Sequence, residues 1–335
     1  MTIQVTKESV NLREKLNELE TNKGLKGNEI LQAETAQEVR SLIGAGRKNL
    51  IINGGFDVWQ RGTSFSSISN GAYCADRFNT SRSHTVNISR VTSGVSGFKY
   101  AHRHTNVTAG VGTLYHHIEN TGQFYAGQSV TLSFWARASE AIDVRTLRVW
   151  DGASYVTSYD VVNITTSWQK ITTTQVIKSN WDGSEASFNV QVWTGNSSNM
   201  SAGSWIETTG VQLELGSVAT DFEHRSYGEE LALCQRYYQR IPADGFNGYT
   251  RTETPMMNNS DRIGVPLLPV TMRDRPTAVA YSTAGTTDRL TEFSSGVART
   301  VSAVYNEGVS GGGYVQLTTS ATNPVYLNMT FDAEL

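Results

Sequence analysis

Residues 130–137 read Val-Thr-Leu-Ser-Phe-Trp-Ala-Arg, and their pattern is the clearest indication of the fold class. Apolar residues occupy every second position, which is the period of a strand that buries one face. Residues 187–193 repeat the pattern, and Val211 and Leu213 alternate with polar neighbours. Six further segments read as strands: 86–91, 98–105, 112–119, 144–150, 155–162 and 168–177. Because no helical pattern separates them, we predict an antiparallel β-sandwich over residues 49–223, of a length that suits a jelly roll.

Helical periodicity precedes the sandwich. Within residues 6–23, Leu12, Leu16 and Leu19 recur at helical spacing, and a second single-striped helix is predicted over 28–43. Isolated helices of this length are marginal in water, so they need a partner surface. We therefore predict that the segment 1–48 associates with copies of itself or docks onto a larger assembly. The alternative is that it packs on the domain that follows.

A second change of pattern follows the sandwich. Residues 227–239 predict a connecting helix, within a link that spans 224–240, because acidic residues open this stretch and basic residues close it. Beyond it, short alternating runs at 313–318 and 325–330 again indicate strands. We predict a smaller C-terminal β domain over 241–335. The fold class is thus mainly β, with a short helical segment at the N-terminus.

Composition excludes several partners. The chain has 335 residues, of which 18% are charged, and its net charge is −3, whereas binding nucleic acid requires a basic surface. No apolar run approaches the ~20 residues that span a bilayer, and the charged N-terminus is unlike a secretory signal. The only cysteines, Cys74 and Cys234, make neither a disulfide framework nor a metal knuckle. We expect a soluble chain made in a reducing cytoplasm, without nucleic acid or membrane insertion.

Histidines cluster in two neighbouring predicted strands. His102 and His104 are two residues apart, so they share one face of a strand, and His116 or His117 could approach from the next. Three imidazoles at such a place would suit a transition-metal ion. The alternative is that these histidines belong to the polar surface or to a hydrogen-bonded core.

Several motifs resemble known families. Residues 49–62 (NLIINGGFDVWQRG) look like the opening strand of CBM4/9-type carbohydrate-binding jelly rolls, and 205–207 with 210–214 look like the closing strand. A longer combination resembles tail-fibre and receptor-binding proteins of tailed bacteriophages: 49–62, 75–78 (ADRF), 132–139 (LSFWARAS), 167–172 (SWQKIT), 210–240, and the stretch 269–277. The short helical stretch 30–45 resembles the connectors of such fibres.

This resemblance implies a homotrimeric virion appendage, a tail-fibre subunit made in the host cytoplasm and carried on the tail. Its N-terminal segment would attach to tail or other virion proteins, and its function would be adhesion to host-surface polysaccharide. Many weak sugar contacts in several copies would supply the avidity. The alternative is a purely structural virion component, such as a head fibre, a collar or a tail spacer.

Two strands offer residues for sugar contact. Trp135 and Arg137 lie on the non-core side of one strand, and Trp193 shares the non-core side of another with Asn189 and Gln191. Aromatic rings can support the apolar face of a sugar while amides and charges meet its hydroxyl groups. We predict that these five residues contact glycan. The alternative is that a loop, the C-terminal domain or a neighbouring copy covers both faces, and Trp59 is predicted to pack in the core.

The sequence also bears on calcium binding and on catalysis. In carbohydrate-binding jelly rolls of this kind the acidic residue after NGGF often belongs to a structural calcium site, which here implies Asp57. The alternative is that Asp57 caps a turn or pairs with an arginine, and no other cofactor is expected. The sequence holds no GxSxG, HExxH or Walker A motif, so we predict that the protein is not an enzyme. A glycan depolymerase stays open as an alternative, because paired carboxylates are brought together in space rather than in sequence.

Overall fold

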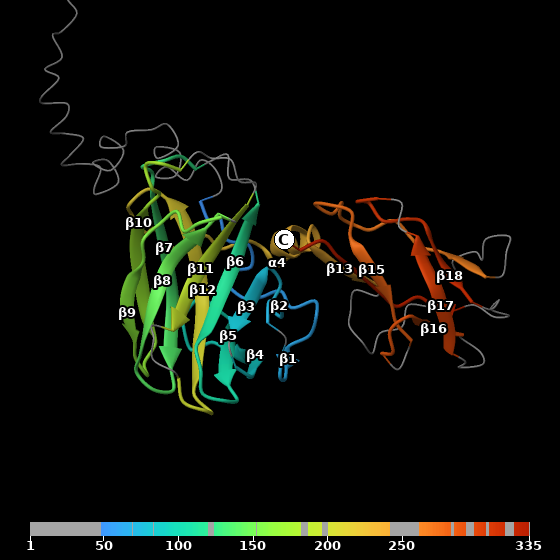
Figure 1. The fold of residues 1–335 in the computed structure, drawn as a ribbon, viewed down its shortest axis with the longest axis horizontal. Coiled ribbons are helices and arrows are strands. Elements are labelled where there is room, and N and C mark those ends of the chain that lie inside the picture. Colours follow the sequence, from blue (N-terminus) through green and yellow to red (C-terminus); the bar gives the residue numbers. More distant parts are fainter. Residues whose placement is uncertain are drawn as a thin grey trace, which may run out of the picture.

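The computed structural model describes residues 48–334 except 69, 83, 120–123, 152, 182–186, 196–199, 242–260, 283–284, 293–297, 306–307 and 319–324. These residues form a β-sandwich and a smaller C-terminal β unit, with a helix between them (Figure 1). The mainly β class predicted from the sequence is confirmed. The two helices predicted at 6–23 and 28–43 lie outside the described residues.

The sandwich consists of two six-stranded antiparallel sheets, here called sheet I and sheet II. Sheet I has the order β1 (Ser64–Phe65), β4 (Val86–Thr92), β5 (Tyr100–Asn106), β12 (Trp205–Leu215), β7 (Ser129–Ala138) and β10 (Gln169–Val176). Sheet II has the order β2 (Ala72–Tyr73), β3 (Phe78–Arg82), β6 (Gly112–Glu119), β11 (Ser187–Gly195), β8 (Ile142–Trp150) and β9 (Asp160–Ile164). The antiparallel sandwich predicted from period-2 alternation is therefore confirmed.

The core lies between the two sheets. On β7, Leu132 and Phe134 are fully buried in it, whereas Trp135 and Arg137 lie half-buried on the outer face. Trp59 packs in the same core, as predicted, and its indole Nε1 donates to the carbonyl oxygen of Phe56 at 2.7 Å. Alternation on this strand thus separates core from surface as the sequence indicates.

The opening motif, residues 49–62, is held against strand β12 by hydrogen bonds and a close backbone contact. The Asn49 side chain donates to the carbonyl oxygen of Val211 at 3.1 Å and accepts from the amides of Ile51 and Leu213 at 2.9 and 3.2 Å. At Gly54 the chains approach so closely that a Cβ would lie 2.0 Å from the Val211 carbonyl oxygen. Only glycine fits there. The residues of this motif therefore join the start of the sandwich to its last strand.

The connecting helix α4 (Tyr227–Gln235) begins at Ser226, which forms a capping box with Glu229. It ends earlier than the predicted 227–239, because strand β13 (Tyr238–Ile241) begins three residues later. Glu230 accepts the Asn53 amide at 2.6 Å, so the helix is fastened to the opening motif of the sandwich. In the part of the chain that the structure describes, no helix has the length and apolar character needed to cross a membrane.

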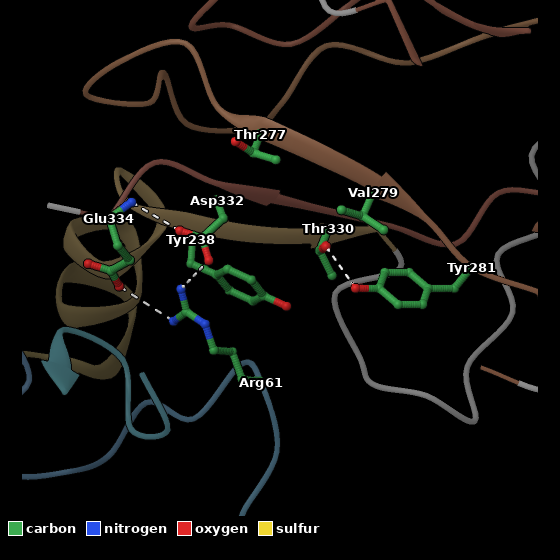
Figure 2. A pocket seen from close by; sticks show the side chains of 8 residues that line it. All are labelled: Arg61, Tyr238, Thr277, Val279, Tyr281, Thr330, Asp332 and Glu334. Atoms are coloured by element: carbon green, nitrogen blue, oxygen red, sulfur yellow. Dashed lines mark hydrogen bonds and ion pairs between the residues drawn. The ribbon is translucent and has the colours of Figure 1, made fainter. Parts of the chain in front are cut away.

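The C-terminal unit contains a three-stranded and a five-stranded antiparallel sheet. The first has the order β13, β20 (Met329–Asp332) and β15 (Thr277–Ala280). The second has the order β14 (Arg262–Gly264), β18 (Tyr314–Leu317), β17 (Ala298–Tyr305), β16 (Arg289–Glu292) and β19 (Val325–Tyr326). Their shared core includes Leu290, Val315 and Phe331. One face of the three-stranded sheet meets the sandwich through Arg61 (Figure 2).

Candidate functional site

The five residues predicted to contact glycan do not form one site. Trp135 and Arg137 lie on the outer face of sheet I, and Asn189 and Gln191 lie on strand β11 of sheet II. Trp193 is inside the core, with none of its surface exposed. The face predicted from the sequence is correct only where side chains alternate along the strand without interruption.

The prediction that Trp193 faces solvent is wrong. The pairing of β11 with β6 shifts between Gln191 and Trp193, which is a β-bulge, and an extra residue in a strand turns the next side chain to the opposite face. The Trp193 indole Nε1 donates to Thr208 Oγ1 at 2.9 Å, and its ring meets His104 edge-on at 5.4 Å. Trp193 is therefore a packing residue.

The outer face of sheet II carries two of the predicted amide side chains, those of Asn189 and Gln191. Gln191 is buried, and its Nε2 donates to the hydroxyl groups of Tyr115 and Tyr155 at 2.9 and 3.1 Å. The Arg148 guanidinium lies 3.3 Å from the centre of the Tyr155 ring. The side-chain oxygens of Asn189 and Gln191 are buried without a hydrogen-bond partner. Gln191 therefore lies beneath the surface, whereas Asn189 is partly exposed with its side-chain oxygen turned inward.

The outer face of sheet I carries a row of three charged side chains. Arg103, Glu207 and Arg137 are cross-strand neighbours on β5, β12 and β7. Arg103 Nε donates to Glu207 Oε1 at 2.8 Å, and Arg137 Nε donates to Oε2 at 2.7 Å. The Glu207 side chain is 0% exposed, whereas each arginine side chain is 33% exposed. A guanidinium has five N–H donors, so both arginines retain donors beyond those that Glu207 accepts.

Two tryptophans accompany these arginines. The guanidinium carbons of Arg103 and Arg137 lie 4.7 and 5.5 Å from the centre of the Trp205 ring. Arg137 also lies 5.1 Å from the centre of the Trp168 ring. Such stacking holds a guanidinium in place through the negative face of the indole. We call Arg103, Arg137, Trp168, Trp205 and Glu207 the arginine–tryptophan row.

Sequence reasoning found one member of the row and missed four. The sequence predicts Arg137 but not Arg103, Trp168, Trp205 and Glu207, because these four residues come from three segments whose register is invisible in the sequence. The one available signal was the segment 205–207, whose Trp and Glu stand two positions apart and so share a face. Trp135, the other predicted residue of this sheet, lies beside the row.

Two further features shape this face. Exposed Lys170 on β10 is the cross-strand neighbour of Trp135, so it adds positive charge close to the row. A Cβ on Gly94, in the loop between β4 and β5, would lie 3.0 Å from the Trp168 indole nitrogen. Three strands separate β4 from β10, so this loop must cross the outer face of the sheet. The predicted alternative of a covering loop therefore holds for part of the face.

The predicted metal residues have other surroundings. His102 and His104 do share the inner face of β5, but His102 lies against the rings of Phe56 and Trp59 at 5.4 and 6.0 Å. Burial lowers the pKa of His102 to about 3, so it is neutral. His116 Nε2 accepts the Ile52 amide at 3.1 Å. Among the described residues no group of three or more His, Cys, Asp or Glu could hold a metal ion. His102, His104 and His116 are all buried, and a transition metal at these residues stays a prediction.

Asp57 lies among basic side chains. Burial raises the pKa of its carboxyl group, and the neighbouring basic groups of His224, Lys99 and Arg90 act in the opposite direction. Such neighbours stabilise a carboxylate without a metal and repel a cation. Calcium at Asp57 stays a prediction.

No family model matches the chain, and no curated protein matches it. Among solved structures, a CBM4 structure shares 16% identity over 50% of this chain and 99% of its own, with a TM-score of 0.34. The CBM22-1 xylan-binding domain from Paenibacillus barcinonensis Xyn10C shares 14% identity over 47% of this chain and 94% of its own, with a TM-score of 0.30.

A bacteriophage protein is also among the similar structures. The enzymatically active domain of tailspike protein 4 from bacteriophage CBA120 shares 15% identity over 45% of this chain, with a TM-score of 0.34. The matched region covers 22% of that tailspike chain. Structures similar to this chain thus include carbohydrate-binding modules and one phage tailspike.

Proposed function

We propose that this protein is a glycan-binding subunit of a bacteriophage tail fibre, and that the arginine–tryptophan row on sheet I contacts acidic sugars of the host surface. The observation that carries the proposal is the row itself. Two arginines stay one-third exposed beside two indoles, and the single carboxylate between them is fully buried.

The chemistry of the row suits an acidic sugar. The apolar face of a pyranose ring can pack on an indole, and a guanidinium donates charge-assisted hydrogen bonds to a carboxylate or phosphate. At the row, Arg103, Arg137 and Lys170 outnumber Glu207, so the charge there is locally positive although the whole chain has a net charge of −3. A local excess of positive charge attracts an anionic glycan and repels a cationic one.

The place on the virion and the oligomeric state rest on the sequence. The resemblance of residues 49–62 and 210–240 to phage fibre proteins supports a tail appendage, and the amphipathic pattern of 1–48 supports a homotrimer attached through that segment. Three copies of a shallow site would raise the overall affinity well above that of one site. We propose no catalytic activity.

Two rival functions remain distinguishable. If the arginine–tryptophan row only stabilises sheet I, the protein is a structural virion component such as a head fibre, a collar or a tail spacer. If carboxylates act on a bound polysaccharide, the protein is a depolymerase. Neither rival predicts salt-sensitive retention of intact acidic glycan.

A glycan array with the full-length chain tests the proposal. We expect retention on glycans that carry uronate or phosphate, weaker retention on neutral ones, and a steep loss as salt rises, because screening weakens exposed charges. Absence of binding to every glycan would favour the structural component. Release of oligosaccharides from host polysaccharide during incubation would favour the depolymerase.

A further inference from the structure

An open cavity of about 600 Å³ lies where the C-terminal unit meets the sandwich (Figure 2). Arg61 of the sandwich forms one wall, and the three-stranded sheet forms the other. The volume falls within the range of about 300–1,000 Å³ that is usual for small-molecule sites. None of the residues that line this cavity belongs to the arginine–tryptophan row.

The strand register makes the sheet wall polar. Tyr238, Asp332 and Thr277 are neighbours across β13, β20 and β15, and Thr330 pairs with Val279 in the next cavity-facing row. The residues between them face the other way, where Phe331 and Ala280 pack in the C-terminal core. A sheet with one apolar and one polar face normally turns the polar face to water. Here the side chain of Arg61 covers one end of the polar face.

Arg61 fixes the position of this wall. Its side chain is 11% exposed, and its Nη2 lies 3.0 Å from Asp332 Oδ2. Its guanidinium carbon lies 3.7 Å from the centre of the Tyr238 ring. Arg77 makes a second ion pair across the junction, with Glu334, and lies 3.4 Å from the centre of the Tyr237 ring. The cavity is therefore complete only when both units are docked.

The lining groups select a hydroxylated ligand. The Asp332 side chain is 44% exposed and offers carboxylate acceptors beside its cross-strand neighbour Tyr238. The Arg61 guanidinium lies within ion-pair distance of Asp76, Asp332 and Glu334. Figure 2 shows the Tyr238 phenol pointing into the space between Arg61 and Tyr281. Burial raises the pKa of Tyr238 to about 12, so its hydroxyl group keeps its proton and can donate.

Charge narrows the class of ligand further. An anion would meet two lining carboxylates, those of Asp332 and Glu334, against one guanidinium. An ammonium group would meet Arg61 in the same space. We propose that this cavity is a second carbohydrate site, which takes an uncharged sugar residue. It does not depend on the acidic-glycan site of sheet I, and the two sites would read different parts of one polysaccharide.

Filling the cavity tests this proposal. Thr277 is exposed on β15, so Thr277→Trp places an indole in the cavity without removing any contact of Arg61. Thr300→Trp, at an exposed position of β17 outside the cavity, is the matched control. The probes are methyl glycosides of glucose, galactose, mannose, N-acetylglucosamine and N-acetylgalactosamine, with glucuronate and glucosamine as charged comparisons. Saturation-transfer NMR on the full-length chain measures their binding.

We expect at least one uncharged glycoside to bind the wild type. Thr277→Trp should weaken that binding roughly tenfold or more, whereas Thr300→Trp and Lys170→Glu should leave it unchanged. Asp332→Asn keeps the size of the side chain and an oxygen that can accept from Arg61, but it removes the charge of the acceptor, and it should weaken binding roughly fivefold. This variant decides the matter if Thr277→Trp fails to fold.

Four outcomes would overturn the second site: no uncharged glycoside binds, only a charged sugar binds, both cavity variants bind as the wild type does, or Lys170→Glu alone abolishes binding. The last result would place the sugar on sheet I, which leaves the proposed adhesion function standing.

Discussion

Replacing Gly54 with alanine should lower the free energy of unfolding by more than about 4 kcal/mol, or prevent folding altogether. The added Cβ would lie 2.0 Å from the Val211 carbonyl oxygen, and backbone cannot yield as a flexible side chain can. The two chains would have to separate, which breaks the bond from the Val211 amide to the Gly54 carbonyl oxygen at 2.9 Å. The contact between the opening motif and strand β12 would then be lost.

Gly228→Ala is the control for that substitution. Gly228 lies in α4, and a Cβ there would meet no atom within 4 Å. Alanine should leave stability unchanged or raise it by up to about 1 kcal/mol, because it favours the helix more than glycine does. Urea unfolding followed by circular dichroism measures both variants. Equal stability of the two would mean that residue 54 is not pressed against β12.

Trp193→Ala should lower the free energy of unfolding by about 3–5 kcal/mol. The indole is fully buried, and its removal leaves a cavity between the two sheets and a Thr208 hydroxyl group without its partner. Trp135→Ala is the matched comparison on the outer face of sheet I, where the indole is only half-buried, and it should cost far less. Similar unfolding midpoints for the two variants would contradict the inward position of Trp193.

The sandwich could be predicted because its signal is local. The alternation in 130–137 appears in β7 with the expected core face, and the predicted segments 86–91 and 112–119 appear as β4 and β6. Burial of every second side chain produces this pattern wherever a strand has one face in a core. The opening motif was also visible, although its physical reason, the contact between Gly54 and β12, was not.

The site could be predicted only in part because its contacts are not local. A one-residue bulge in β11 moved Trp193 from the surface to the core, and nothing in the alternating sequence announces a bulge. Arg103 and Glu207 stand 104 positions apart, and Arg61 and Asp332 stand 271 apart. Such pairs follow from strand order and domain docking. The sequence of one strand contains neither.

The two proposed sites would bind differently charged sugar residues of one polysaccharide, acidic ones at the arginine–tryptophan row and uncharged ones in the junction cavity. The arginine–tryptophan row is positive and lies on the outer face of one sheet. The junction cavity has more carboxylates than guanidinium groups and lies at the border with the C-terminal unit. Two weak sites on one chain act on a single polymer with a high effective concentration, and further copies would multiply the effect.

The most direct measurement of the central claim is the affinity of the full-length chain for an acidic polysaccharide retained on the array, compared among three variants at low salt. Lys170→Glu reverses an exposed charge beside Trp135, and Lys178→Glu makes the same change at an exposed lysine beside Tyr155 of the other face. Trp205→Ala removes the indole between the two arginines. Circular dichroism verifies that each variant is folded.

We predict that Trp205→Ala loses about 1–2 kcal/mol of binding free energy, which is roughly a five- to thirty-fold loss of affinity. Lys170→Glu should weaken binding several-fold, and Lys178→Glu should bind as the wild type does. Wild-type affinity in both Lys170→Glu and Trp205→Ala would contradict glycan binding at the arginine–tryptophan row and leave the row as packing surface alone.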